Sequence, residues 1–468
     1  MATLRATPAD SAAADGGIEE NAMVILDTSG IKEARDLDDD RAAFLDTVRS
    51  ACLASDKPSP PSWRMYNAVF QILQNSSLLE LTMASFHLLM ELGKQYPRTY
   101  LTDSGSRQAV VVVKESWSPF LLGNDVACGE IGASTSQLDH LFDSSRFSSL
   151  IEDMAETASD IDAKNGIEHI KNIVLLQYLV STLEADFVPR NVAYKESSHW
   201  VIIRESLLQM LLVSRKLAFK SLVKNCMSLL LNQYYREVEN GISSKEGSTK
   251  SASDLDSFLT VVSFEFERSA LASVRKLFIM VMNLDLIRKE ADKKGLTSRA
   301  DGIRSPIMDV VLDELTYNIS YLSPFLLTME WKWRLEIILQ YFSKYCGKPV
   351  VRTQRTDNSQ RDLTLENVLS LFSTATTAKS IVKKMGSEVA QLLLANAYQA
   401  CLSVEGDSGK DNDTTTKIGT TLLQISDSFV SAFQNLKKIS PNIQISSFEK
   451  EALFTAATLT RKLKNEPR

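Results

Sequence analysis

The sequence predicts an all-α protein built from stacked helical hairpins, an armadillo- or HEAT-like right-handed superhelix with degenerate repeats. Three observations support this fold class. Apolar residues recur with a period near 3.6 over long segments, strand signals are weak, and short turns join successive amphipathic segments. Of the 468 residues, 44% are hydrophobic and 24% are charged, as in ordinary folded proteins. No crisp repeat signature occurs, so we expect the repeats to be degenerate.

The acidic residues are concentrated at the N-terminus. Residues 1–50 contain eleven acidic and five basic residues, which accounts for the whole net charge of −6 and leaves 47 of each sign afterwards. Residues 1–20 have few large apolar side chains, so we predict a disordered acidic tail there. We predict a single extended helical-repeat domain over residues 21–468, with disordered insertions near 241–254 and 405–416. Because the folded part is electrically neutral, its bulk charge does not favour nucleic-acid binding.

The first helices are predicted from the aspartates at 38–40 onwards. These acids lie where a helix N-terminus favours negative charge, ahead of an apolar stripe that begins at Phe44. The linker KPSPP (57–61) precedes a second stripe over 62–73 and a third helix that ends near Pro97. The last two segments predict a helical hairpin of about forty residues, the size of one armadillo or HEAT unit.

The middle of the chain is predicted to be helical with one exception. The stretch AVVVV within residues 103–113 is the only plausible strand, although a buried extended segment or a short helix fits as well. Residues 116–137 are punctuated by Pro, Gly and Ser and predict a loop. Helices are expected at 147–163, 167–186, 194–215 and 217–239, and further on at 364–373, 379–404, 417–438 and 446–464. Residues 258–294 are expected to form either one long helix or a kinked pair.

Residues 296–355 contain two further helix signals. Ser305 and Pro306 predict a helix start, because serine caps helices and proline suits the first helical position. Residues 331–345 predict a helix that is apolar around most of its circumference and therefore buried on several sides. Trp331 and Trp333 are either an exposed recognition pair or core residues. Tryptophans at helical spacing usually pack, so we expect at least one of them in the core.

The candidate site residues are basic and flank these two helices. They lie in the loop before the first helix and in the extended segment after the second: Arg299, Arg304, Lys348, Arg352 and Arg355. One interpretation is that they contact phosphate groups or an acidic partner surface, which leaves direct DNA contact open. The alternative is that they pair with carboxylates such as that of Asp301 or are solvated in a linker, which is common on a neutral protein.

No motif predicts catalysis, a metal or a cofactor. The phosphate-binding loop of nucleotide-binding proteins is absent, and no dinucleotide, zinc-protease, hydrolase or EF-hand pattern occurs. The four histidines are isolated, so we expect no metal site and regard each as a partly exposed helical residue. We therefore expect a protein that is not an enzyme and takes neither cofactor nor small-molecule substrate.

The cellular compartment is predicted from the cysteines and from two absent signals. The five cysteines are widely spaced and form no CxxC pair, which favours reduced thiols in cytosol or nucleus. We find no signal peptide and no apolar run of the roughly 18 residues that a membrane span requires. We expect an intracellular, soluble protein without membrane contact.

Several long motifs resemble one family, the plant negative regulators of systemic acquired resistance. The resemblance covers nearly the whole chain. The motifs are KEARDLDDDRAAFLDTVRSA (32–51), MYNAVFQIL (65–73), SFHLLMELGKQYP (85–97), DFVPRNVAYKE (186–196), LTSRADGIRSPIMDVVLDELTYN (296–318), WRLEIILQYFSKY (333–345) and KPVVRTQRT (348–356).

The resemblance implies a leucine-rich, armadillo-like protein of the nucleus without catalytic residues. It implies a role as the non-SMC element-six-type subunit of the structural maintenance of chromosomes complex of the five/six class, in DNA damage repair, homologous recombination and repression of defence genes. The implied partners are the element-five-type subunit and the SMC subunits. The alternative is a transcriptional corepressor that acts on chromatin independently of that complex.

Overall fold

The structure, a computed structural model, describes residues 20, 22–26, 34–55, 58–98, 100–102, 110–112, 117–122, 140–158, 167–243, 254–302, 304–346, 364–408, 415–442 and 444–465. The chain divides into two compact units, residues 1–305 and residues 306–468. The single domain predicted over residues 21–468 stays a prediction. The predicted tail at 1–20 lies, apart from Glu20, outside the described residues.

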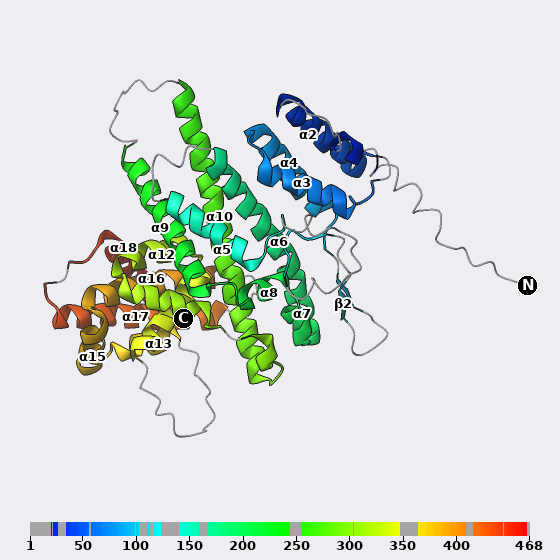
Figure 1. The fold of residues 1–468 in the computed structure, drawn as a ribbon. Helices are drawn as coiled ribbons and strands as arrows, with labels where there is room; N and C mark the ends of the chain where they lie inside the picture. Colours follow the sequence, from blue (N-terminus) through cyan, green and yellow to red (C-terminus); the bar gives the residue numbers. More distant parts are fainter. Residues whose placement is uncertain are drawn as a thin grey trace, which may run out of the picture. The chain divides into compact units, whose positions relative to one another are not determined.

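The described residues of the first unit are mostly helical (Figure 1). Its elements in chain order are α2 (Ala34–Arg49), η1 (Ser50–Ala54), α3 (Trp63–Asn75), α4 (Leu79–Gln95), β1 (Tyr100–Thr102), β2 (Val110–Val112), α5 (Ser144–Thr157), α6 (Ile167–Ser197), α7 (Trp200–Arg204), α8 (Leu207–Val213), α9 (Phe219–Ser243), α10 (Asp254–Lys293) and η5 (Arg299–Asp301). The two short strands pair antiparallel, with Tyr100 opposite Val112. The second strand lies within the predicted AVVVV stretch.

The predicted hairpin over residues 62–97 is confirmed as α3 and α4. The Ser62 hydroxyl accepts a hydrogen bond from the Met65 N–H at 3.3 Å and starts α3. After α3, the Ser76 hydroxyl accepts from the Leu78 N–H at 3.1 Å, which holds the turn into α4. Phe70 is fully buried in this unit.

Helices α9 and α10 form an antiparallel hairpin. At one end, Phe219 at the start of α9 and Asp285 near the end of α10 both contact Arg304. At the other end, Arg236 of α9 forms an ion pair with Glu267 of α10. Helices α5 and α6 form a second hairpin, because the end of α5 and the start of α6 line one shared cavity.

The hairpin α5–α6 stacks on the hairpin α9–α10 with like helices parallel. Between α6 and α10, His169 lies 3.9 Å from Glu267, and further along both helices Lys276 Nζ lies 2.7 Å from Glu184. Next to the start of α5, Asp143 pairs at 3.1 Å with Lys216, just ahead of α9. Parallel stacking of antiparallel hairpins is the arrangement of helical repeats, so the predicted fold class is confirmed. The right-handed superhelical path stays a prediction.

One predicted helix, 194–215, is wrong. Helix α6 continues through Pro189 to Ser197, where Ser198 has a positive φ of 58° and ends the helix. Two short helices follow, and the second begins at Ser206, whose hydroxyl accepts from the Gln209 N–H at 3.2 Å. The apolar spacing of the sequence continues across this break, so the sequence pattern predicts one helix there.

The second unit is also helical. Its elements are α11 (Ile307–Tyr317), η6 (Ile319–Tyr321), α12 (Leu322–Thr328), α13 (Trp331–Cys346), α14 (Leu365–Leu371), α15 (Ala375–Met385), α16 (Ser387–Ser408), α17 (Thr415–Ile439) and α18 (Ser447–Asn465). Helix α16 packs against α13, α17 and α18. In its core, Tyr398 stacks on Phe429 at 4.4 Å between ring centroids and hydrogen-bonds Ser426 at 2.9 Å.

Two helices predicted in the second unit differ from the structure. Pro306 occupies the N-cap of α11 instead of its first turn, and no side chain caps that helix. The helix predicted at 379–404 is two helices, because Gly386 with a φ of 86° ends α15 before α16 begins.

The two predicted insertions are shorter than expected. Residues 241–243 and 254 belong to α9 and α10, and residues 405–408 and 415–416 belong to α16 and α17. What remains of each insertion, 244–253 and 409–414, lies outside the described residues. None of the described helices is both long and apolar enough to cross a membrane.

Candidate functional site

The loop that carries Arg299 and Arg304 is shaped by a capping box. The Ser298 side chain accepts from the Asp301 N–H, while the Asp301 carboxylate accepts from the Ser298 N–H at 2.6 Å. Asp301 is buried for this reason, although it is a charged residue in a loop. The next residue, Gly302, has φ 78° and ψ 152°, a conformation that essentially only glycine adopts.

This loop is fixed to α8 of the same unit. The side-chain amide of Gln209 donates to the Asp301 carbonyl at 3.1 Å. A Cβ on Gly302 would lie 2.7 Å from the Cβ of Val213, so the backbone approaches α8 more closely than any other residue type permits. Arg288 also donates to the Gly302 carbonyl. The sequence RADG at 299–302 is therefore explained by packing.

The two described candidate arginines differ in exposure. The side chain of Arg304 is 7% exposed and forms an ion pair with Asp285 at 2.7 Å, and its guanidinium lies 4.5 Å from the centroid of the Phe219 ring. Desolvation lowers the pKa of Arg304, and Asp285 opposes this shift. Arg304 is thus held inside the unit, as the alternative interpretation of a carboxylate pair requires. Arg299 is exposed.

The other three candidates, Lys348, Arg352 and Arg355, lie outside the described residues. Contact of any of the five with phosphate or a partner stays a prediction. The tryptophans next to them are placed: Trp333 is 4% exposed and Trp331 is 40% exposed, with the Arg334 guanidinium 4.2 Å from the Trp331 ring centroid. The expectation that at least one tryptophan packs in the core is confirmed.

A second buried charge cluster is centred on Asp186 in the motif DFVPR. Its carboxylate accepts from Arg190 Nε at 3.0 Å and from the Leu207 N–H, the first of α8, at 2.8 Å. Arg190 in turn donates to the Ile202 carbonyl at 3.0 Å, and Arg98 lies 3.6 Å from Asp186. The cluster ties α6 to the two short helices that follow it, so this motif also has a structural explanation.

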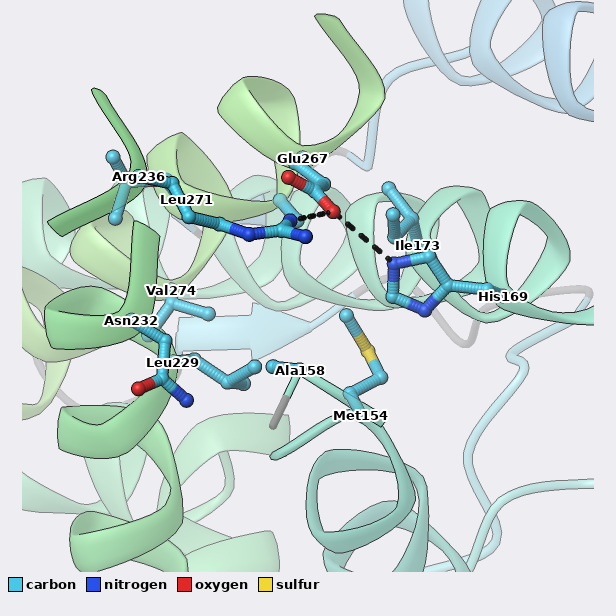
Figure 2. A pocket seen from close by; sticks show the side chains of 11 residues that line it. Met154, Ala158, His169, Ile173, Leu229, Asn232, Arg236, Glu267, Leu271 and Val274 are labelled. Carbon is cyan, nitrogen blue, oxygen red and sulfur yellow. Dashed lines mark hydrogen bonds and ion pairs between the residues drawn. The ribbon is translucent and has the colours of Figure 1, made fainter. Parts of the chain in front are cut away.

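A third cluster lies where the two stacked hairpins meet. Figure 2 shows Arg236 and His169 pointing toward Glu267 from two different helices. They line a cavity of about 40 Å³ between α5, α6, α9 and α10. A cavity needs a volume of about 10–15 Å³ to hold one water molecule, and ligand pockets usually have volumes of several hundred Å³. This cavity therefore suits water and not a substrate.

His169 corrects the sequence analysis, which expected every histidine to be partly exposed. The residue is 7% exposed and packs beside Glu267. Arg236, Glu267 and Asp186 were not singled out either. For Asp186 a signal existed, an Asp–Arg pair at i, i+4 that starts at the end of the predicted helix 167–186 and lies within α6. For Glu267 the sequence contains no such signal, because its partners Arg236 and His169 are 31 and 98 residues away in sequence.

The described residues show no arrangement typical of catalysis. No group of three or more His, Cys, Asp or Glu side chains in them is placed to hold a metal ion. The buried cysteines include Cys226, whose thiol pKa is raised to about 12 by burial, so that it stays protonated and unreactive. The charge clusters hold helices together, and the cavity that the described residues form at the Glu267 cluster is only about 40 Å³.

Comparisons with known proteins cover most of the chain. The family models described as SNI1 middle domain and SNI1 C-terminal domain match residues 97–330 and 346–464. A curated protein of Arabidopsis thaliana, "Negative regulator of systemic acquired resistance SNI1", is 36% identical over 453 residues, which are 95% of each chain. No solved structure matches.

Proposed function

Because the chain belongs to the SNI1 family of negative regulators of systemic acquired resistance, we propose that it is a non-enzymatic nuclear scaffold subunit of the structural maintenance of chromosomes complex of the five/six class. In this role it acts in DNA damage repair and homologous recombination and represses plant defence genes. Its partners are the element-five-type subunit and the SMC subunits. Family membership supports the role as a negative regulator. Membership of the five/six-class complex is proposed in addition to that role.

The observation that carries the proposal is the stacking of α5–α6 on α9–α10. Stacked hairpins present extended surfaces and are widely used to bind proteins. The carboxylates of Asp186, Asp301 and Glu267 in the first unit each contact a group from another helix, namely the Leu207 N–H, Arg204 and Arg236. Such charges fix the shape of a scaffold and contribute no chemistry.

Copurification tests this function. The full chain, tagged at its own locus in a plant that lacks the untagged copy, is isolated from nuclei and its partners are identified by mass spectrometry. We expect the element-five-type subunit and both SMC subunits in amounts close to that of the bait. Recovery of the chain from nuclei without any SMC subunit contradicts the proposal and favours a corepressor that acts apart from the complex.

A genetic comparison separates the two functions. If the chain acts through the complex, loss of an SMC subunit and loss of this chain should derepress the same defence genes, and the double mutant should resemble either single mutant. If defence genes remain derepressed when damage signalling is blocked in the null mutant, the corepressor function is supported instead.

A further inference from the structure

The described residues of the first unit also line a groove that is larger than the cavity at Glu267. It has a volume of about 700 Å³, and its walls come from α3, the end of α4, the segments around residues 97 and 118, α6 and α10. Pockets that bind small ligands or a few side chains are typically about 300–1,000 Å³. We call it the aromatic groove. Its aromatic lining residues are Tyr66, Tyr96, Trp117 and Tyr178.

The aromatic wall of this groove is held rigid from behind. Tyr66 and Trp117 stack with their ring centroids 5.3 Å apart and nearly parallel planes, and the edge of Phe70 packs against Trp117. The Tyr96 hydroxyl donates to the Cys52 carbonyl at 2.7 Å, which fixes the far rim. Rigid aromatic side chains supply contact area at a low cost in conformational entropy, which is why they dominate protein-binding surfaces.

The charged side chains of the groove are mainly basic. Lys94, Arg98 and Lys276 line it, against Glu184 alone. Glu184 is paired with Lys276 at 2.7 Å. Behind the wall, Asp186 is shared between Arg98 at 3.6 Å and Arg190 at 3.0 Å, so these three side chains carry a net charge of +1. A ligand with a carboxylate near Arg98 and Lys94 complements this charge.

We propose that the aromatic groove binds a short acidic segment of a protein partner, in which Asp or Glu side chains face Lys94 and Arg98 and a neighbouring apolar side chain packs on Tyr66 and Trp117. The groove is too small for a nucleic-acid duplex, and its aromatic wall gains from apolar contact that a phosphate backbone lacks. This proposal rests on the proposed scaffold role in one respect, because that role supplies the protein partner.

Gly93 provides a variant that blocks the groove without disturbing the fold. It lines the groove within α4, and a Cβ added there meets nothing within 4 Å. Glycine inside a helix is less favourable than residues with a side chain, so Gly93→Leu should leave α4 at least as stable. Lys94→Glu reverses one wall charge, and Lys220→Glu on α9, also exposed and outside the groove lining, is the matched control.

The test is a selection followed by binding measurements on the purified full chain. A phage-displayed library of random peptides of about twelve residues is selected against the wild type, and enriched peptides are labelled and titrated by fluorescence anisotropy. We expect Asp or Glu beside Phe, Trp, Leu or Ile in the enriched set. Gly93→Leu and Lys94→Glu should each weaken binding at least about tenfold, while Lys220→Glu should change it less than about twofold.

Five results would overturn the proposal. The first is an enriched set without acidic residues, or no enriched peptide at all, and the second is a peptide affinity that Gly93→Leu does not change. The third is binding of a single-stranded DNA oligonucleotide with the same sensitivity to Gly93→Leu. The fourth is binding of a synthetic peptide of residues 10–33, which would make this chain the occupant of the groove. Conversion of a dimer to a monomer by Gly93→Leu in light scattering would point to a second copy and also count against it. Copurification of SMC subunits is measured separately, so failure of one proposal leaves the other standing.

Discussion

Replacement of Gly302 by alanine should destabilise the first unit more than replacement of Gly386 by alanine destabilises the second unit. The two glycines have nearly the same backbone conformation, φ 78° and ψ 152° for Gly302 and φ 86° and ψ 151° for Gly386. Holding a non-glycine residue there costs about 1–3 kcal/mol. Only at Gly302 does the new Cβ meet another residue, at 2.7 Å from the Cβ of Val213. No rotamer change moves that atom, so the backbone must shift, which adds about 1–3 kcal/mol.

The expected losses of unfolding free energy are therefore about 1–3 kcal/mol for Gly386→Ala and about 2–6 kcal/mol for Gly302→Ala. Urea denaturation followed by far-ultraviolet circular dichroism measures both. Hydrogen exchange adds a local readout, because the amides of α7 and α8 should lose protection only in Gly302→Ala. A Cβ at residue 302 would also lie 2.9 Å from Cγ1 of Val213. Val213→Ala removes that methyl group but keeps the Cβ, so it should recover part of the loss, with a coupling of about 0.5–3 kcal/mol in a double-mutant cycle. Equal losses at the two glycines, or no coupling to Val213, would refute the packing explanation of this motif.

Four further predictions follow from the buried groups. Arg304→Gln should cost about 3–5 kcal/mol because it leaves Asp285 without this partner in a buried site, whereas Arg299→Gln should stay within about 0.5 kcal/mol; similar thermal shifts would contradict this. Asp186→Ala should also cost about 3–5 kcal/mol, against less than about 1 kcal/mol for Glu184→Gln in its exposed pair. Burial raises the pKa of Tyr66 to about 12 from an ordinary value near 10, so the folded state favours the neutral phenol. The stability that this preference contributes is fully present below pH 10 and is lost as pH rises through 12. In Tyr66→Phe, the fall in the free energy of unfolding over this pH range should be smaller by about 2–3 kcal/mol. Finally, the raised pKa of the Cys226 thiol predicts that a disulfide reagent at pH 8 modifies it only after urea unfolding; rapid labelling of the native protein would show that the site opens.

The helices were predictable because their apolar periodicity is strong and local. The Ser62 cap and the spacing of Phe70 with its neighbours are visible in the sequence, and the hairpin α3–α4 lies where that pattern placed it. The break at Ser198 was not predictable in this way. Ser198 adopts a positive φ although no glycine or proline marks the position.

The candidate site was less accessible to sequence reasoning than the fold. A basic residue in a loop has the same local pattern whether it faces solvent, as Arg299 does, or an internal acid, as Arg304 does. Only the three-dimensional contact with Asp285 on α10 decides between them. The motifs RADG and DFVPR were informative about the family, but their reason is structural, since Gly302 and Asp186 both fix the segments around α8. The aromatic groove had no sequence signature, because its walls come from five separated segments.

Crosslinking of the native nuclear assembly, read out by mass spectrometry, tests the central claim most directly. The account predicts crosslinks from the lysines of this chain to the element-five-type and SMC subunits, and it predicts that they persist when DNA is digested beforehand. Crosslinks that are confined to transcription factors or histones, with the SMC subunits absent from the sample, would contradict it.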